Sequence, residues 1–240
     1  MIKYFSELGL SEMLYSAFGY VAMLAELTVG MLICRKMNIK WWKALLFFAV
    51  SFCLRGYISN FIWWANKGFT DFGGGHLTRA YPYIPLLIII PLALLLRVEK
   101  RRACDFSGAT LLVFQAPVHL GCLFFGCCGG YESSIGVYSP MLDKVIVPVQ
   151  LFDTITSAAI AIAVLVYMYK KKWDTKGVIF PLAMILHGAD RFFWEFFRDH
   201  TRLFLGLTNL QYHALFLIAV GIISLILVNR YNKRLEGETA

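Results

Sequence analysis

The sequence predicts an all-α integral membrane protein with about seven transmembrane helices in one domain. Of its 240 residues, 59% are hydrophobic and 16% are charged, and the mean hydropathy is +0.64. These values leave too few polar side chains to cover a water-soluble globule of this size, and they exclude a disordered chain. Six cysteines in a chain of this length are also too sparse for a disulfide-stapled secreted mini-protein.

Seven apolar runs follow one another along the chain. They cover residues 13–34, 41–63, 81–96, 107–126, 149–169, 177–198 and 209–229. Several of them match the roughly 20 residues that a bilayer-crossing helix needs. The third run is short and holds Pro82, Pro85 and Pro91, so we expect a tilted, kinked or partly re-entrant helix there.

The two ends of the chain complete one polytopic domain over residues 1–240. We expect the first run to be a retained helix, because no basic start leads directly into a short apolar core and a small-residue cleavage site. Residues 1–10 are then expected to form an interfacial segment, and residues 230–240 a cytoplasmic tail.

Basic residues occupy alternate connections between the runs and predict the orientation. The chain has 23 Lys and Arg against 15 Asp and Glu, a net charge of +8. Fifteen of the 23 follow the first, third, fifth and seventh runs: Arg35, Lys36, Lys40, Lys43, Arg97, Lys100, Arg101, Arg102, Lys170, Lys171, Lys172, Lys176, Arg230, Lys233 and Arg234. Basic connections stay on the cytoplasmic side, so we expect an external N-terminus and a cytoplasmic C-terminus. No basic patch is left unexplained, and we expect no nucleic-acid partner.

The sixth run carries an ionisable stripe near its predicted external end. An ionisable side chain costs about 2.5–3.5 kcal/mol at the centre of a membrane helix, so each one needs a partner or a purpose. His187, Arg191, Glu195 and Arg198 are spaced by four, four and three residues and share one helix face, on which Arg191 and Glu195 can pair. An aromatic belt with snorkelling arginines explains the outer part of the stripe only. Cations at this depth suit a grip on phosphate.

A group of thiols lies at the external end of the fourth run. His119, Cys122, Cys127 and Cys128 are residue types that bind metals, and the glycines around them, Gly121, Gly126, Gly129 and Gly130, permit a tight turn. The spacing is not a standard zinc pattern, because adjacent cysteines rarely bind one ion well, and we assign no metal and no cofactor. Two alternatives stay open: a disulfide from Cys122 to one of the other two, or small thiols that fill a helix-packing surface.

Two further polar segments lie on the same predicted side. Pro148 suits the first turn of a helix, after which Gln150 and Asp153 face inward or toward the interface. The connection before the third run holds three glycines, His76 and Arg79, and a glycine-rich loop can wrap a headgroup through its amides. Glu26, in the first run, has no partner that the sequence identifies.

Together these segments resemble the family of phosphatidylglycerol–prolipoprotein diacylglyceryl transferases, multi-pass enzymes that attach a diacylglyceryl group to a cysteine of bacterial lipoprotein precursors. The resemblance runs from about Tyr20 to the basic tail. Its most specific part is residues 191–198, which are similar to the family's RFxxEFFR element, and Gln211 stands in the place of a glutamine that follows that element. Residues 148–153 resemble the family's Pro-x-Gln-Leu-Tyr-Glu, with conservative changes at the last two positions.

The family signature between the third and fifth runs is only partly kept. The glycines at 121, 126 and 130 match its frame, while His119 and the cysteines stand where the family has arginine, asparagines and a glutamate. The family's His-Gly-Gly loop is approximated by Gly73–Gly74–Gly75–His76. The chain therefore resembles a divergent, cysteine-bearing branch of the family.

The resemblance implies a multi-pass enzyme of the bacterial cytoplasmic membrane. Its substrates would be phosphatidylglycerol, or another anionic glycerophospholipid, and the lipobox cysteine of a lipoprotein precursor. That thiol, with an ordinary pKa of about 8.5, must become a thiolate and displace glycerol phosphate. Arg191 is our first candidate to stabilise the departing phosphate, with Glu195 to orient it and Arg198 or Arg79 to assist.

The remaining roles are less specific. His119 or His76 is the candidate base, since an unperturbed histidine titrates near neutral pH. The substrate-binding residues implied are Gln150, Arg198, Arg79, Gly121, Gly126, Gly130, Tyr20 and Gln211. Two other functions stay open: a thiol-redox or metal-handling membrane protein built on His119 and the three cysteines, and an inactive lipid-binding relative.

Overall fold

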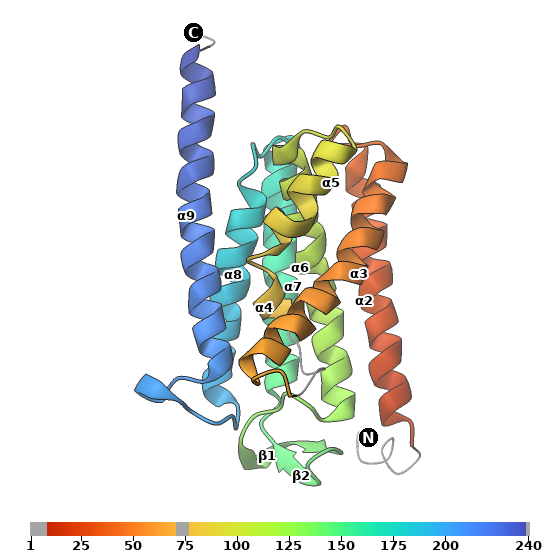
Figure 1. Ribbon diagram of the computed structural model, residues 1–240. Coiled ribbons are helices and arrows are strands. Elements are labelled where there is room, and N and C mark those ends of the chain that lie inside the picture. Colours follow the sequence, from red (N-terminus) through yellow and green to blue (C-terminus); the bar gives the residue numbers. More distant parts are fainter. Residues whose placement is uncertain (1–8, 71–76, 239–240) are drawn as a thin grey trace.

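The computed structural model describes residues 9–70 and 77–238, which form a bundle of helices with a small β-hairpin at one end (Figure 1). Five helices are long and apolar enough to cross a membrane: α2 (Ser11–Cys34), α3 (Trp41–Asn66), α6 (Lys100–Phe125), α7 (Val149–Lys170) and α9 (Asn209–Glu238). Both the helical class and the membrane-spanning character predicted from composition are thus seen in the described residues. Residues 1–8 of the expected interfacial segment, and His76, lie outside them.

The third and sixth apolar runs form shorter helices. The third run forms a π-helical turn, η1 (Pro85–Ile89), and α5 (Ile90–Leu95), as its prolines suggest, and the short α4 (Leu77–Ala80) precedes it. The sixth forms α8 (Ile179–Trp194), which continues as the 3₁₀ turn η2 (Glu195–Phe197). All seven runs are helical, but only five reach the length of a full span, so the count of seven crossings stays a prediction.

Helix α6 is the central element of the bundle. In the most apolar 18-residue stretch of α6, 56% of the residues are buried inside the bundle, whereas the corresponding share is 22–33% in the other four long helices. It packs on α2, α7 and α8. At Gly108 a Cβ atom would lie 2.8 Å from Cα of Phe180, so the glycine allows α6 and α8 to touch through their backbones.

Hydrogen bonds gather the basic connections at one end of the bundle. Arg101 Nη1 donates to Asn232 Oδ1 at 3.0 Å, and Asn232 Nδ2 donates to the carbonyl of Lys176 at 3.0 Å. Lys43 Nζ reaches the carbonyl of Leu96. The connections after α2, α5 and α7 therefore lie at the same end of the bundle (Figure 1), in agreement with the alternation of charge. That this end faces the cytoplasm stays a prediction.

Two features differ from the expectations. Residues 230–238 do not form a separate tail, because α9 continues without a break to Glu238. The all-α prediction also misses an antiparallel hairpin, β1 (Glu132–Ser139) and β2 (Lys144–Ile146), in the polar connection after α6. A search for long apolar runs cannot detect strands this short, whose inner side needs only Ile146 to be buried.

A buried ion pair resolves the position of Glu26. Arg55 Nη1 and Nη2 donate to the two carboxylate oxygens of Glu26 at 2.9 and 2.8 Å, and both residues are buried. The guanidinium of Arg55 also lies 4.1 Å from the ring centroid of Phe114. This bidentate pair joins α2 to α3 and leaves neither charge alone among apolar side chains.

Asp105 holds the start of α8 from a different helix. It is buried in α6, accepts hydrogen bonds from the backbone N–H groups of Gly177 and Ile179 at 2.8 and 2.7 Å, and accepts one from Thr175 Oγ1 at 2.6 Å. The first N–H groups of a helix have no partner within the helix, so this carboxylate satisfies donors that would otherwise be buried without one.

We predict that Asp105→Ala lowers the free energy of unfolding by about 3 kcal/mol, because several charge-assisted hydrogen bonds are lost and buried N–H groups lose their acceptor. Thermal unfolding of the purified protein in detergent measures this. The control is Asp174→Ala, which removes an exposed acid from the same connection and should change the melting temperature little. Equal effects of the two substitutions would contradict the capping role.

Candidate active site

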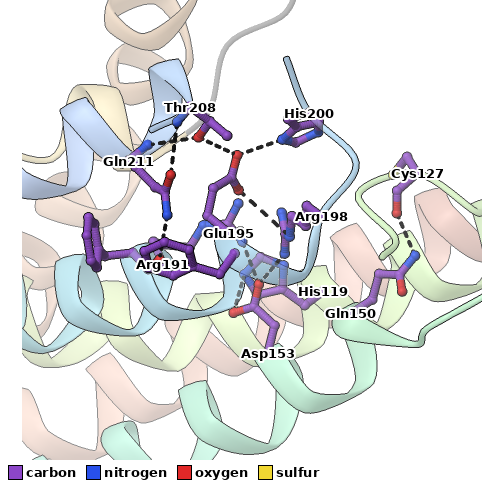
Figure 2. A network of polar contacts seen from close by, with 12 residues as sticks. His119, Cys127, Gln150, Asp153, Arg191, Glu195, Arg198, His200, Thr208 and Gln211 are labelled. Atoms are coloured by element: carbon purple, nitrogen blue, oxygen red, sulfur yellow. Dashed lines mark hydrogen bonds and ion pairs between the residues drawn. The ribbon is translucent and has the colours of Figure 1, made fainter. Parts of the chain in front are cut away.

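Asp153, a residue of α7, contacts three basic side chains through its carboxylate at the hairpin end of the bundle (Figure 2). Its Oδ2 accepts hydrogen bonds from Arg191 Nη1 at 2.5 Å and from Arg198 Nη2 at 2.6 Å. His119 Nε2 lies 3.5 Å from the other oxygen, Oδ1. All four residues are buried. We call these four residues the Asp153 cluster.

Four segments bring this cluster together, and the first of them is α6, which carries His119. Helix α7 begins after Pro148, and Gln150 and Asp153 then lie three residues apart on its inner face. Helix α8 presents Arg191 in its last turn. The chain leaves helical geometry at Arg198, with φ −99° and ψ 145°, and this turn directs the side chain back to Asp153. The sequence predicted that His187, Arg191, Glu195 and Arg198 share one helix face. In the structure α8 ends before Arg198, and the turn at Arg198 places its side chain beside Arg191.

Glu195 is the centre of a second group of contacts, next to the first. Its Oε1 lies 2.6 Å from His200 Nδ1 and accepts a hydrogen bond from Thr208 Oγ1 at 2.9 Å. Its Oε2 lies 3.9 Å from Arg198 Nε. Gln211 supports this group, since its Oε1 accepts from the Thr208 backbone N–H at 2.9 Å. Glu195 therefore joins the connection before α9 to the Asp153 cluster.

A cavity of about 590 Å³ opens beside Glu195. Its walls include Trp63, Arg79, His200 and Thr208. The guanidinium of Arg79 lies over the ring of Trp63, 4.6 Å from its centroid. The cavity thus combines an aromatic surface, a buried cation and the Glu195 carboxylate, a lining that suits an amphipathic ligand with an anionic group.

Several nitrogen atoms of the Asp153 cluster have no hydrogen-bond partner among the described residues. They are the donors Arg191 Nη2 and Arg198 Nη1 and the two ring nitrogens of His119, and each is buried. Buried polar groups in proteins are almost always hydrogen-bonded, so unpartnered guanidinium N–H groups indicate a place for an additional acceptor. A phosphate oxygen matches them in charge and geometry.

The glycines of the fourth run allow backbones to approach each other. At Gly130 a Cβ atom would lie 2.8 Å from the Phe197 carbonyl oxygen, and Gly130 forms a β-bridge with Arg198. Gly121 packs against α2, and Gly126 ends α6 with φ +84°. None of these three predicted substrate-binding glycines lines the 590 Å³ cavity, and each contacts other parts of the described chain.

The structure differs from two expectations about individual side chains. Arg191 forms its ion pair with Asp153 rather than with Glu195, because the 3₁₀ turn at Glu195 directs this carboxylate toward His200. Tyr20 is 65% exposed on α2 and does not belong to the polar contacts described above. His187 also has another role: its Nε2 lies 3.1 Å from Thr78 Oγ1.

The other predicted residues lie where their motifs suggest. Gln150 is buried, and its Nε2 donates to the carbonyl of Cys127 at 2.7 Å, so it joins α7 to the cysteine-bearing turn. Sequence reasoning missed Thr208 and His200, as well as the role of Asp153 as shared acceptor. The only available signal for Asp153 was its spacing of three residues from Gln150.

These features define a multi-pass helical membrane protein with a cluster of buried cations at one end of its helices. The chain belongs to the prolipoprotein diacylglyceryl transferase family, whose model matches residues 84–227. The phosphatidylglycerol–prolipoprotein diacylglyceryl transferase 2 of Clostridium perfringens is 30% identical over 175 residues, which are 70% of this chain and 68% of the relative. The corresponding transferase of Clostridium tetani is 31% identical over 138 residues, 54% of each chain. The family resemblance inferred from the motifs is confirmed.

We predict that Asp153→Ala lowers the free energy of unfolding by about 3–5 kcal/mol, since it leaves two buried guanidinium groups without their shared acceptor. The control is Asp190→Ala, which removes the half-buried acid next to Arg191 and should cost about 1 kcal/mol, because its hydrogen bond from Ser157 Oγ is long, at 3.2 Å, and no buried cation depends on it. Chemical unfolding of both variants in detergent makes the comparison. If Asp153→Ala is no more destabilising than the control, the shared carboxylate does not hold the cluster together.

Proposed function

We propose that this chain transfers the diacylglyceryl group of phosphatidylglycerol, or of another anionic glycerophospholipid, to the lipobox cysteine of a lipoprotein precursor. The observation that carries the proposal is the set of unpartnered donors on Arg191 and Arg198. Neither arginine lines the 590 Å³ cavity, but Arg198 lies 3.9 Å from Glu195, which does. The names of the two curated relatives support the same reaction. Nothing in the relatives supports a thiol-redox protein or an inactive lipid-binding protein.

The reaction places its main demand on the leaving group. The acceptor thiol loses its proton, and its sulfur attacks the glycerol carbon that carries the phosphate. The carbon–oxygen bond breaks, and its electron pair leaves with glycerol phosphate. Negative charge therefore grows on a phosphate oxygen, and donors already held in position stabilise it most where water is excluded.

Different side chains stabilise the departing phosphate, hold the arginines in place and accept the thiol proton. Arg191 and Arg198 donate N–H groups to the phosphate, and Asp153 fixes both guanidiniums by occupying one nitrogen of each. Glu195 positions Arg198 from the other side. Arg79 is the cation that meets the headgroup in the cavity. His119, with both ring nitrogens unpartnered, is the candidate to receive the thiol proton.

The orientation completes the proposal. The basic end of the bundle faces the cytoplasm and the hairpin end faces outward, with all seven helical runs crossing the bacterial cytoplasmic membrane. The Asp153 cluster then lies at the depth of the outer leaflet, where lipid headgroups and an exported precursor meet. The short α8 and α5 complete their crossings through the polar segments that follow and precede them.

We predict that Arg191→Lys and Arg191→Ala each lower kcat by about 10²–10³, because lysine keeps the charge but lacks the planar fork of N–H groups that spans Asp153 and phosphate. The assay uses the purified protein, phosphatidylglycerol vesicles and a peptide with a lipobox cysteine, and mass spectrometry detects the lipidated peptide. Arg35→Lys, at an exposed position at the other end of α2, is the matched control and should be fully active. Unchanged turnover in both Arg191 variants would refute its role, and no product with any glycerophospholipid would refute the reaction.

Epitope tags test the orientation. We predict that a tag inserted at residues 140–143, between the two strands, is reached by antibody in cells whose outer layers alone are permeabilised. A tag in the connection at residues 171–178 should be reached only after the cytoplasmic membrane is opened, because that connection carries a cluster of lysines. The opposite pattern would reverse the proposed orientation.

A further inference from the structure

Three thiols gather beside the Asp153 cluster, and the mechanism above does not use them. The Sγ atoms of Cys122, Cys127 and Cys128 all lie within 4.8 Å of one another. Cys122 is buried and the other two are half-buried, and within the described chain no disulfide joins them. We call these three residues the thiol cluster.

A sharp backbone turn brings the thiols together. Helix α6 ends at Gly126, which has φ +84°, and Cys128 is also left-handed, with φ +59°. Adjacent side chains in a regular helix or strand point in different directions, and this is why two neighbouring cysteines rarely share one ion. The left-handed residue removes that obstacle here and holds both thiols toward Cys122, at the energetic cost of a conformation that residues other than glycine seldom adopt.

The thiol cluster adjoins the proposed phosphate site. Cys122 follows His119 by three residues on α6, and His119 contacts Asp153. The carbonyl of Cys127 accepts the hydrogen bond from Gln150. The half-buried thiols therefore lie next to the cluster that would receive the leaving group.

We propose that the thiol cluster binds one Zn²⁺ through three thiolates, and that the acceptor cysteine of the lipoprotein precursor occupies the fourth position. This inference rests on the proposed function and adds how the acceptor is activated. Catalytic zinc sites keep three protein ligands and one open position, whereas structural sites have four. His119 does not fill that position, because its ring nitrogen is directed to Asp153 and it lies outside the group of candidate ligands.

The geometry requires only a small contraction. Sulfur atoms in a tetrahedral site with Zn–S bonds of about 2.3 Å lie about 3.8 Å apart, so sulfurs within 4.8 Å of one another need to move by about 1 Å or less. A disulfide would use two of the three thiols and would leave the third without a role. Half-buried Cys127 and Cys128 leave a side open to an incoming peptide.

The chemistry fits the difficulty of the reaction. A metal-bound thiol is deprotonated outright, while a free thiol is only a few per cent thiolate at pH 7. As the acceptor sulfur binds the metal, its proton passes to His119, whose Nδ1 has no hydrogen-bond partner among the described residues. Its sulfur then attacks the glycerol carbon, the carbon–oxygen bond breaks, and glycerol phosphate leaves with the electron pair toward Arg191 and Arg198. The metal changes no oxidation state, and no further reactant is needed.

Metal content is the first test. The full-length protein, purified in detergent without added metal and then titrated with Zn²⁺, should bind about one ion per chain by elemental mass spectrometry. The triple variant Cys122→Ser, Cys127→Ser, Cys128→Ser should bind none. Cys53→Ser, at an exposed position on α3, is the matched control and should bind as the unchanged protein does. Absence of binding, or a disulfide between two of the three cysteines in the purified protein, overturns the proposal.

Cobalt tests the open position. Co²⁺ substituted for zinc should give a thiolate charge-transfer band, and a peptide with the lipobox cysteine should change the visible spectrum, whereas the same peptide with serine should not. This readout needs neither lipid nor turnover, and it does not depend on the folding of a variant. A spectrum that ignores both peptides overturns acceptor binding at the metal.

Chelation separates this inference from the proposed function. Removal of the metal from the unchanged protein should lower the transfer rate by at least about tenfold, and Zn²⁺ should restore it. Full transfer after chelation overturns the metal proposal and leaves the transferase function intact. A cobalt spectrum that responds to the cysteine peptide, without transfer from any glycerophospholipid, supports the metal site and refutes the function.

Discussion

The hairpin end of this protein depends on one shared carboxylate. Asp153 accepts hydrogen bonds from Arg191 and Arg198 through the same oxygen, and all three side chains are buried. One carboxylate cannot satisfy two guanidinium groups, each with five N–H donors. Glu195 contributes only a longer contact, 3.9 Å from Arg198. The arrangement holds two cations rigidly and still leaves donors available, which is what an anion site inside a low-dielectric environment requires.

Two other sets of buried charges form more complete hydrogen bonds. Glu26 and Arg55 pair with each other through two parallel hydrogen bonds, and Asp105 accepts hydrogen bonds from two backbone N–H groups and a hydroxyl. These interactions fasten helices, and they leave no capacity for a ligand. Arg191 and Arg198 instead keep buried N–H groups without a partner among the described residues, and Arg198 lies beside Glu195, which lines the cavity. Unpartnered donors on buried cations therefore distinguish this site from the ion pair and the helix cap.

The sequence predicted those features that depend on one segment of the chain at a time. Composition and apolar runs predicted a membrane helix bundle, and the 191–198 motif predicted the family. It could not predict contacts that depend on how separate helices are rotated, such as Glu26 with Arg55 or Asp153 with Arg191. Helical spacing favoured Arg191 with Glu195, and the turn to 3₁₀ geometry at Glu195 redirected that carboxylate. The hairpin was missed because its strands are too short to give an apolar signal.

An antiparallel β-bridge between Gly130 and Arg198 joins the segment just before the hairpin to the residue whose guanidinium binds Asp153. Three hydrogen bonds hold this region: the Tyr131 N–H donates to the Phe197 carbonyl at 3.2 Å, the Tyr131 hydroxyl donates to the Phe196 carbonyl at 3.1 Å, and Arg202 Nη2 donates to the Tyr131 hydroxyl at 2.6 Å. The backbone at the base of the hairpin is therefore joined directly to the backbone that carries Arg198. The tip of the hairpin can vary in length without affecting the site. An insertion or deletion of one residue at its base, next to Gly130, would displace the fully buried guanidinium of Arg198.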